Sequence, residues 1–120
     1  MSVNNEFLRY VLDQLRGVGV VTSRKMFGGA GLYLDGTIFG LIAYDTLYFK
    51  VDETNRSDYE EAGMEPFRPF DETSYVMSYY EVPIDVLEEA DELVNWAMKA
   101  LVAARRTPSK KKKRKSGDTN

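Results

Sequence analysis

The chain has 120 residues, of which 43% are hydrophobic, so it can form one domain with a packed core. It contains neither cysteine nor histidine, which excludes disulfides, thiolate nucleophiles and the usual His-based catalytic constellations, and argues against most enzyme classes. The net charge of −3 hides a split between residues 1–104, with eight basic and eighteen acidic residues, and residues 105–120, with eight basic residues and one acid.

Apolar residues at spacings of three and four predict a helix over about residues 4–16. Phe7, Val11 and Leu15 lie on its apolar stripe, and Gly17 suits its end. No stretch approaches the roughly 18–20 consecutive apolar residues of a membrane span, and the N-terminus lacks the pattern of a secretory signal. We therefore expect a cytoplasmic protein.

Residues 20–51 are rich in strand-forming side chains and predict a three-stranded antiparallel meander. Asp35-Gly36 is a strong hairpin signal, and Tyr44-Asp45 marks a second turn. The first strand is expected to be long and interrupted by the glycines of residues 28–31.

The second half of the chain predicts a helix, two strands and a final helix. They are a short helix from Thr54 or Asn55 to Ala62, a short edge strand or extended loop at residues 67–70, a strand at 75–82 and a helix over about 84–104 with Leu93, Ala97, Met98 and Leu101 on its apolar face. The order is α-β-β-β-α-β-β-α, which is typical of an α+β fold with an antiparallel sheet covered by helices. We predict one domain over residues 1–104 and a disordered basic tail over residues 105–120.

Residues 24–31 form the first candidate site. Clustered glycines beside Arg and Lys could bring backbone N–H groups to a phosphate, so a small-ligand or phosphate-binding domain is one hypothesis. The segment matches neither the P-loop nor the dinucleotide pattern, and it joins strand to strand, which favours a bulge or a tight bend instead. The candidate residues are Arg24, Lys25, Met26, Phe27, Gly28, Gly29 and Gly31.

Other chemistry-bearing side chains give weaker signals. Adjacent acids such as Glu60-Glu61 do not share a helix face, which indicates solvated surface rather than a catalytic pair. Tyrosines such as Tyr48 could stack on bases, but the acidic domain favours core packing. An enzyme using Lys25 or Lys50 with a carboxylate is a distant alternative. We predict no catalytic residue, cofactor or metal.

The tail contains the clearest electrostatic feature, a run of six cations. They are Lys110, Lys111, Lys112, Lys113, Arg114 and Lys115. Such a run can bind phosphates without reading sequence, and this binding weakens steeply with salt. A solvated tail that aids solubility is the alternative.

An ordered series of motifs extends through most of residues 5–104. It includes residues 24–33, Phe39-Gly40-Leu41-Ile42, residues 47–52, Asn55-Arg56, Tyr59-Glu60, Ala62-Gly63-Met64, Pro66-Phe67, Met77-Ser78-Tyr79-Tyr80, Pro83 and Trp96-Ala97. This series resembles the N-terminal domain of the TfoX/Sxy regulators of bacterial competence. The resemblance implies an α+β domain related to secretion-chaperone-like folds. It also implies a role near transcription, since family members help a cyclic-AMP receptor protein act at competence promoters.

The leading hypothesis is therefore a non-enzymatic regulatory or adaptor protein that acts through protein contacts. The resemblance makes a transcription factor a candidate partner, and the tail would add non-specific affinity for nucleic acid. Exposed edges of a small sheet also predict a homodimer.

Overall fold

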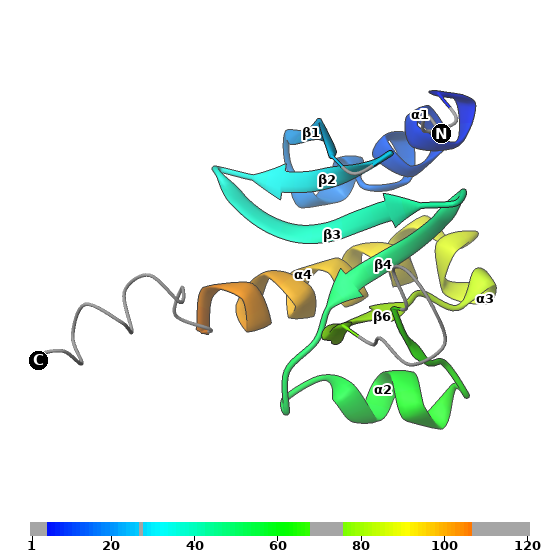
Figure 1. The fold of residues 1–120 in the computed structure, drawn as a ribbon, viewed down its shortest axis with the longest axis vertical. Helices are drawn as coiled ribbons and strands as arrows, with labels where there is room; N and C mark the ends of the chain where they lie inside the picture. Colours follow the sequence, from blue (N-terminus) through cyan, green and yellow to red (C-terminus); the bar gives the residue numbers. More distant parts are fainter. Residues whose placement is uncertain (1–4, 27, 68–75, 107–120) are drawn as a thin grey trace, which may run out of the picture.

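The computed structural model describes residues 5–26, 28–67 and 76–106 of the chain, as one antiparallel sheet with helices (Figure 1). The elements are α1 (Asn5–Gln14), the 3-10 helix η1 (Arg16–Val18), β1 (Val21–Met26), β2 (Gly29–Leu34), β3 (Thr37–Ala43), β4 (Thr46–Lys50), α2 (Arg56–Glu61), β5 (Pro66–Phe67), β6 (Val76–Glu81), α3 (Ile84–Leu87) and α4 (Ala90–Arg106). The strand order is β1-β2-β3-β4-β6-β5, and every neighbouring pair is antiparallel. The predicted α+β class is confirmed.

The first group of strands has four members instead of the three that the sequence predicted. The chain reverses after β1, where Met26 pairs with Gly29, so the expected long first strand is a hairpin of β1 and β2. Gly28 makes this possible because it adopts a φ of 80°, a conformation that costs little only for glycine. The glycines therefore mark a turn within residues 20–34.

The two predicted hairpin turns are confirmed. Asp35 and Gly36 have φ values of 51° and 81°, and Tyr44 and Asp45 have values of 54° and 57°. Two consecutive residues with positive φ form the turn whose twist matches that of the flanking strands. These turns fix the register of β2, β3 and β4.

The predicted final helix is two helices. α3 ends at Leu87, whose carbonyl oxygen accepts a hydrogen bond of 2.9 Å from Nε2 of Gln14 on α1. α4 then starts at Ala90 and continues past Ala104 to Arg106. The bond from α1 satisfies a carbonyl group left free at the end of α3.

The hydrophobic core lies between one face of the sheet and the helices. α4 packs against β3 and β4, and it crosses behind them in Figure 1. Side chains alternate along β4, so that Leu47 and Phe49 are buried whereas Tyr48 and Lys50 are only half-buried. The helices that the structure describes leave the other face of the sheet uncovered.

α2 is fixed to α4 by an aromatic contact and an ion pair. The rings of Tyr59 and Trp96 meet edge to face with centroids 4.7 Å apart. Nζ of Lys99 lies 2.9 Å from Oδ2 of Asp58. The buried ring of Tyr59 thus joins α2 to the core.

Candidate functional site

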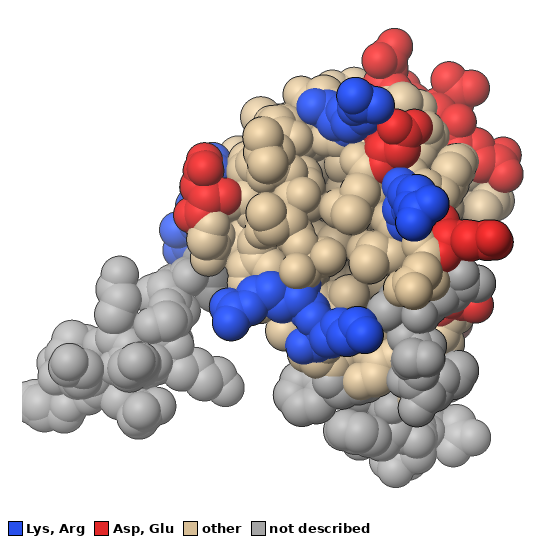
Figure 2. All heavy atoms as spheres, turned by 90° about the horizontal axis from the view of Figure 1, so that it is seen from above, with Lys and Arg blue, Asp and Glu red and all other residues tan. Residues whose placement is uncertain are grey.

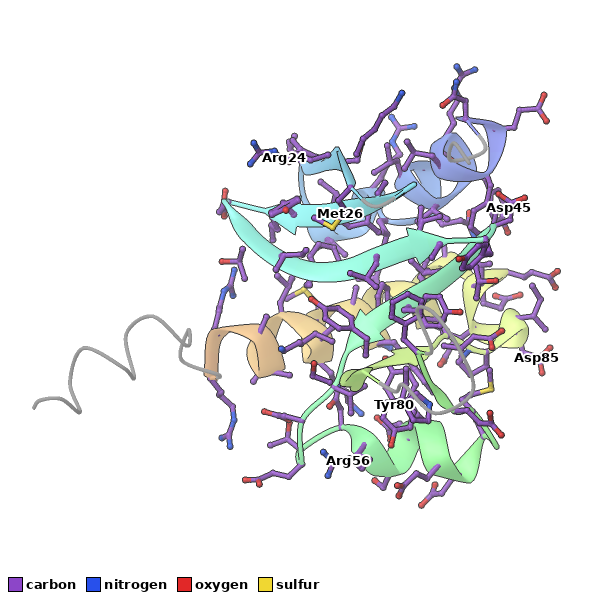
Figure 3. All side chains as sticks on the ribbon, viewed as in Figure 1. Arg24, Met26, Asp45, Arg56, Tyr80 and Asp85 are labelled. Atoms are coloured by element: carbon purple, nitrogen blue, oxygen red, sulfur yellow. The ribbon has the colours of Figure 1, made fainter. Side chains whose placement is uncertain are left out.

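The first candidate segment forms the hairpin of β1 and β2. Arg24 and Lys25 are exposed on β1, which is the edge strand of the sheet, and Met26 is its half-buried last residue (Figure 3). Gly29 is buried on β2 beside β3. Phe27 lies outside the described residues. The hairpin thus places two cations and the turn residue Gly28 on the surface, and Gly29 and Gly31 inside the sheet.

The glycines of β2 have a packing role. A Cβ at Gly29 would lie 2.0 Å from the carbonyl oxygen of Ile42 on β3, so no larger residue fits. A Cβ at Gly31 would lie 3.0 Å from Cε of Met26 and 3.1 Å from Cδ1 of Ile38. β2 is paired with β1 and with β3, so its backbone N–H groups donate hydrogen bonds within the sheet. Ligand binding at this segment stays a prediction.

The face of the sheet that points away from α4 contains aromatic rings and two cations. The guanidinium carbon of Arg24 lies 5.9 Å from the ring centroid of Tyr33, and Nζ of Lys50 lies 5.3 Å from that of Tyr79. At these distances each cation is attracted to the negative face of the ring. Arg24 and Lys50 thus each contact a ring of this face within the chain.

Burial shifts the pKa values of Tyr79 and Lys50 on this face, as it also raises the pKa of Tyr48. It raises the pKa of the Tyr79 hydroxyl to about 12, and the nearby Tyr33 adds to the increase. It lowers the pKa of Lys50, an effect that the negative charge of Asp52 partly opposes. Both shifts arise because a partly dehydrated environment disfavours the charged form.

We expect the free energy of unfolding to decrease as the pH rises from about 10 to about 12. The folded pKa of Tyr79 lies above its ordinary value of 10.0, so the native state binds more protons than the unfolded state in this window. The contribution is complete below pH 10, and roughly 2 kcal/mol of it is lost by pH 12. Urea titrations over this range should show a shallower decline for Tyr79→Phe. An equally steep decline in the variant would contradict the assignment.

A hydrogen-bonded loop follows β4 at residues 52–55. Oδ1 of Asp52 accepts bonds from the backbone N–H and the hydroxyl of Thr54, at 2.8 and 2.6 Å. The buried Asn55 accepts a bond of 2.8 Å from the N–H of Asp52, and its Nδ2 donates one of 3.0 Å to the carbonyl oxygen of Lys50. The side chains of Asp52 and Asn55 thus provide hydrogen-bond partners for backbone groups at the point where the chain leaves the sheet.

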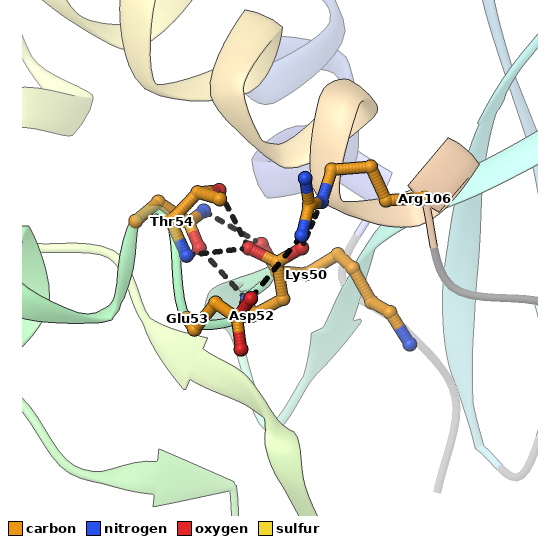
Figure 4. A network of polar contacts seen from close by, with 6 residues as sticks. Lys50, Asp52, Glu53, Thr54 and Arg106 are labelled. Carbon is orange, nitrogen blue, oxygen red and sulfur yellow. Dashed lines mark hydrogen bonds and ion pairs between the residues drawn. The ribbon is translucent and has the colours of Figure 1, made fainter.

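The last residue of α4 is fixed to this loop (Figure 4). Nε of Arg106 lies 3.1 Å from Oδ2 of Asp52, and its Nη2 lies 3.3 Å from Oε2 of Glu53. Burial alone would raise the pKa of Asp52, but the bonds from Thr54 and Arg106 outweigh it and hold the pKa below its usual value. The loop therefore holds the C-terminal end of α4, the last described element before residues 107–120.

Charges are unevenly spread over the described surface. In Figure 2, most Asp and Glu side chains of the visible face lie at one end, a further acidic group lies at the opposite end, and Lys and Arg side chains are scattered over the face. The end with most of the acids is where α1 begins and α3 lies in Figure 1, and α4 ends on the opposite side. The predicted cationic run at residues 110–115 lies outside the described residues.

Comparison with models of protein families shows to which family the chain belongs. The model of the TfoX N-terminal domain matches residues 13–104, which is most of the chain. The chain belongs to the TfoX N-terminal domain family. Comparison with curated proteins gives no match.

This family is of a regulatory type and is not a known enzyme family. Membership indicates that the chain forms a domain like that of the competence regulators. In this TfoX N-terminal domain, residues 5–26, 28–67 and 76–106 contain no group of three or more acidic side chains that could hold a metal ion. No helix in the same part of the chain is long and apolar enough to cross a membrane.

The loop at residues 52–55 and its contact with α4 were missed by sequence reasoning. The spacing of Asp52 and Thr54 is a local signal, because an Asp side chain commonly bonds the backbone two residues on. The pairing of Arg106 with Asp52 has no such signal, since the two residues are distant along the chain. Only the packing of α4 beside β4 in this TfoX N-terminal domain brings them together.

Proposed function

We propose that the protein is a cytoplasmic, non-enzymatic regulatory or adaptor domain that acts through protein contacts. The match to the TfoX N-terminal domain over residues 13–104 is the observation that carries the proposal. Residues 110–115 add non-specific affinity for nucleic acid, which the run of six cations supports. In this proposal the acidic domain makes the protein contacts, and the basic segment binds nucleic acid.

The ion pairs of Arg106 support this division. They hold the last turn of α4 on the domain, so that the positive charge beyond it starts from a fixed point. This point lies on the side of the molecule opposite the crowded acids of Figure 2.

We expect duplex DNA to bind the full chain at low salt and to be released as salt increases. The slope of log binding constant against log salt should steepen by about 0.9 for each cation that contacts a phosphate. The test variant replaces the six cations of residues 110–115 by glutamine, which keeps the length of the chain. Fluorescence anisotropy with a labelled duplex measures both proteins at several salt concentrations.

A second test variant is a chain that ends at Thr107, because it removes the cationic run and keeps Arg106 with its ion pairs to the domain. Both altered chains should lose most of the affinity at low salt. Equal binding by the full chain and the glutamine variant would remove the cationic run from the proposal. A pull-down from native cytoplasm, with and without nuclease, tests the protein contacts, and the absence of any nuclease-resistant partner would contradict an adaptor role.

A further inference from the structure

One edge of the sheet is long and open. β1 is the terminal strand and pairs only with β2, so alternate residues of Val21–Met26 direct their backbone N–H and C=O groups outward. Among the described residues, no backbone hydrogen bond crosses this outer edge of β1. These outward groups can pair with an added strand.

The opposite edge of the sheet is unsuitable for such an addition. β5 comprises only Pro66–Phe67, and proline has no N–H to donate. Of the two edges of the described sheet, β1 is therefore the one that can accept an added strand.

The side chains of β1 determine which strand would fit. Arg24 and Lys25 are both exposed, and as consecutive residues they project to opposite faces. An added strand would thus meet one cation on each of its faces. Val20, just before β1, is 83% exposed and offers apolar surface at the end of the edge. This chemistry matches an extended segment with two adjacent acids and apolar neighbours.

A second copy of the chain fits this edge poorly. An antiparallel pairing that uses most of β1 against β1 of another copy places the two Arg24 side chains opposite or diagonal to each other. Like charges at such positions repel, and basic residues on edge strands are a common protection against self-pairing. The same cations attract an acidic strand.

We propose that the β1 edge binds an extended acidic segment of a partner protein by strand addition. This inference rests on the proposed function, because it names the kind of protein contact that the domain makes. Arg24 and Lys25 select the acids, and the outward backbone groups of β1 supply the hydrogen bonds.

The test uses the full chain labelled with ¹⁵N and an eight-residue peptide that alternates threonine and valine around two central glutamates. A second peptide has lysines in place of the glutamates, and a third is N-methylated at alternate residues to block strand pairing. We expect the glutamate peptide to shift the β1 amide signals and to slow the exchange of the outward-pointing amides. It should bind about tenfold more tightly than the lysine peptide, and the N-methylated peptide should not bind.

Two variants separate this site from the cationic run. The glutamine variant of residues 110–115 should retain the β1 shifts, which excludes attraction of the peptide to that segment. The double variant Arg24→Glu, Lys25→Glu should reverse the preference toward the lysine peptide. Both substitutions change exposed side chains, so the fold should persist.

The proposal is overturned if β1 signals do not move at millimolar glutamate peptide, or if both charged peptides bind equally. It is also overturned if β1 signals move with protein concentration alone, because a second copy would then occupy the edge. If β1 stays unaffected while the full chain still retains a nuclease-resistant protein partner, the edge proposal fails and the proposed function stands. Loss of all protein partners would instead remove the proposed function.

Discussion

Gly29→Ala is expected to lower the free energy of unfolding by about 3 kcal/mol or more. The added Cβ would lie 2.0 Å from the carbonyl oxygen of Ile42. That oxygen belongs to the backbone of β3, so the clash can be relieved only by moving β2 away from β3. Urea unfolding followed by circular dichroism measures the loss.

Gly17→Ala is the matched control. Its Cβ would lie 3.1 Å from Cγ2 of Val94, which is a side-chain atom that can move. We therefore expect this variant to lose less than about 1 kcal/mol. A Gly29→Ala protein as stable as the natural chain would show that β2 and β3 are not in close contact, and the packing explanation for the glycines would fail.

Tyr59→Ala is expected to lower the free energy of unfolding by about 3–5 kcal/mol. The side chain is only 1% exposed, and its ring contacts those of Tyr80 and Trp96, with centroids 5.8 and 4.7 Å away. Its removal would leave a cavity between α2, β6 and α4. Thermal and urea unfolding of the variant test this expectation.

Tyr59→Phe separates the ring from its hydroxyl group. The buried hydroxyl has no hydrogen-bond partner among the residues that the structure describes, and burial strongly raises its pKa. An unpaired buried polar group costs free energy, so the Phe variant should match the natural chain or gain about 1 kcal/mol. A clear loss of stability in Tyr59→Phe would mean that the hydroxyl is bonded.

These buried positions provide a control for the binding experiments. Gly29 and Tyr59 are both buried in the described domain, so their substitution changes the folded fraction and not the exposed surfaces. At a temperature where Tyr59→Phe is fully folded, its affinity for DNA and for the glutamate peptide should equal that of the natural chain. Stability effects and interaction effects can thus be measured independently.

The local features of the fold were predictable because short-range interactions set them. Asp35-Gly36 and Tyr44-Asp45 form the predicted hairpin turns. Gly36 and the two Asp residues are types that adopt positive φ at low cost, whereas Tyr44 is held there by the pairing of β3 with β4. The alternation along β4 also places Leu47 and Phe49 in the core and Tyr48 on the other face, as predicted.

Features that depend on distant partners were predicted less well. The glycines of residues 28–31 fit both an interrupted strand and a turn, and only the pairing of Met26 with Gly29 distinguishes the two. Met98 was expected on the apolar face of the final helix but is 46% exposed, because Leu93, Ala97 and Leu101 provide the stripe that contacts the sheet.

The sequence by itself determined the α+β class, the hairpin turns, the family resemblance and the separation of an acidic domain from a basic end. The turns follow from local conformational preferences, and the fold class, the resemblance and the charge split follow from the order and composition of residues along the chain. None of these properties requires knowledge of tertiary contacts. The tertiary structure alone decided that β1 is an open edge with Arg24 and Lys25 on it, and that Arg106 is held on Asp52 and Glu53. Both depend on which strands and helices become neighbours, and that is determined by the packing of the whole core.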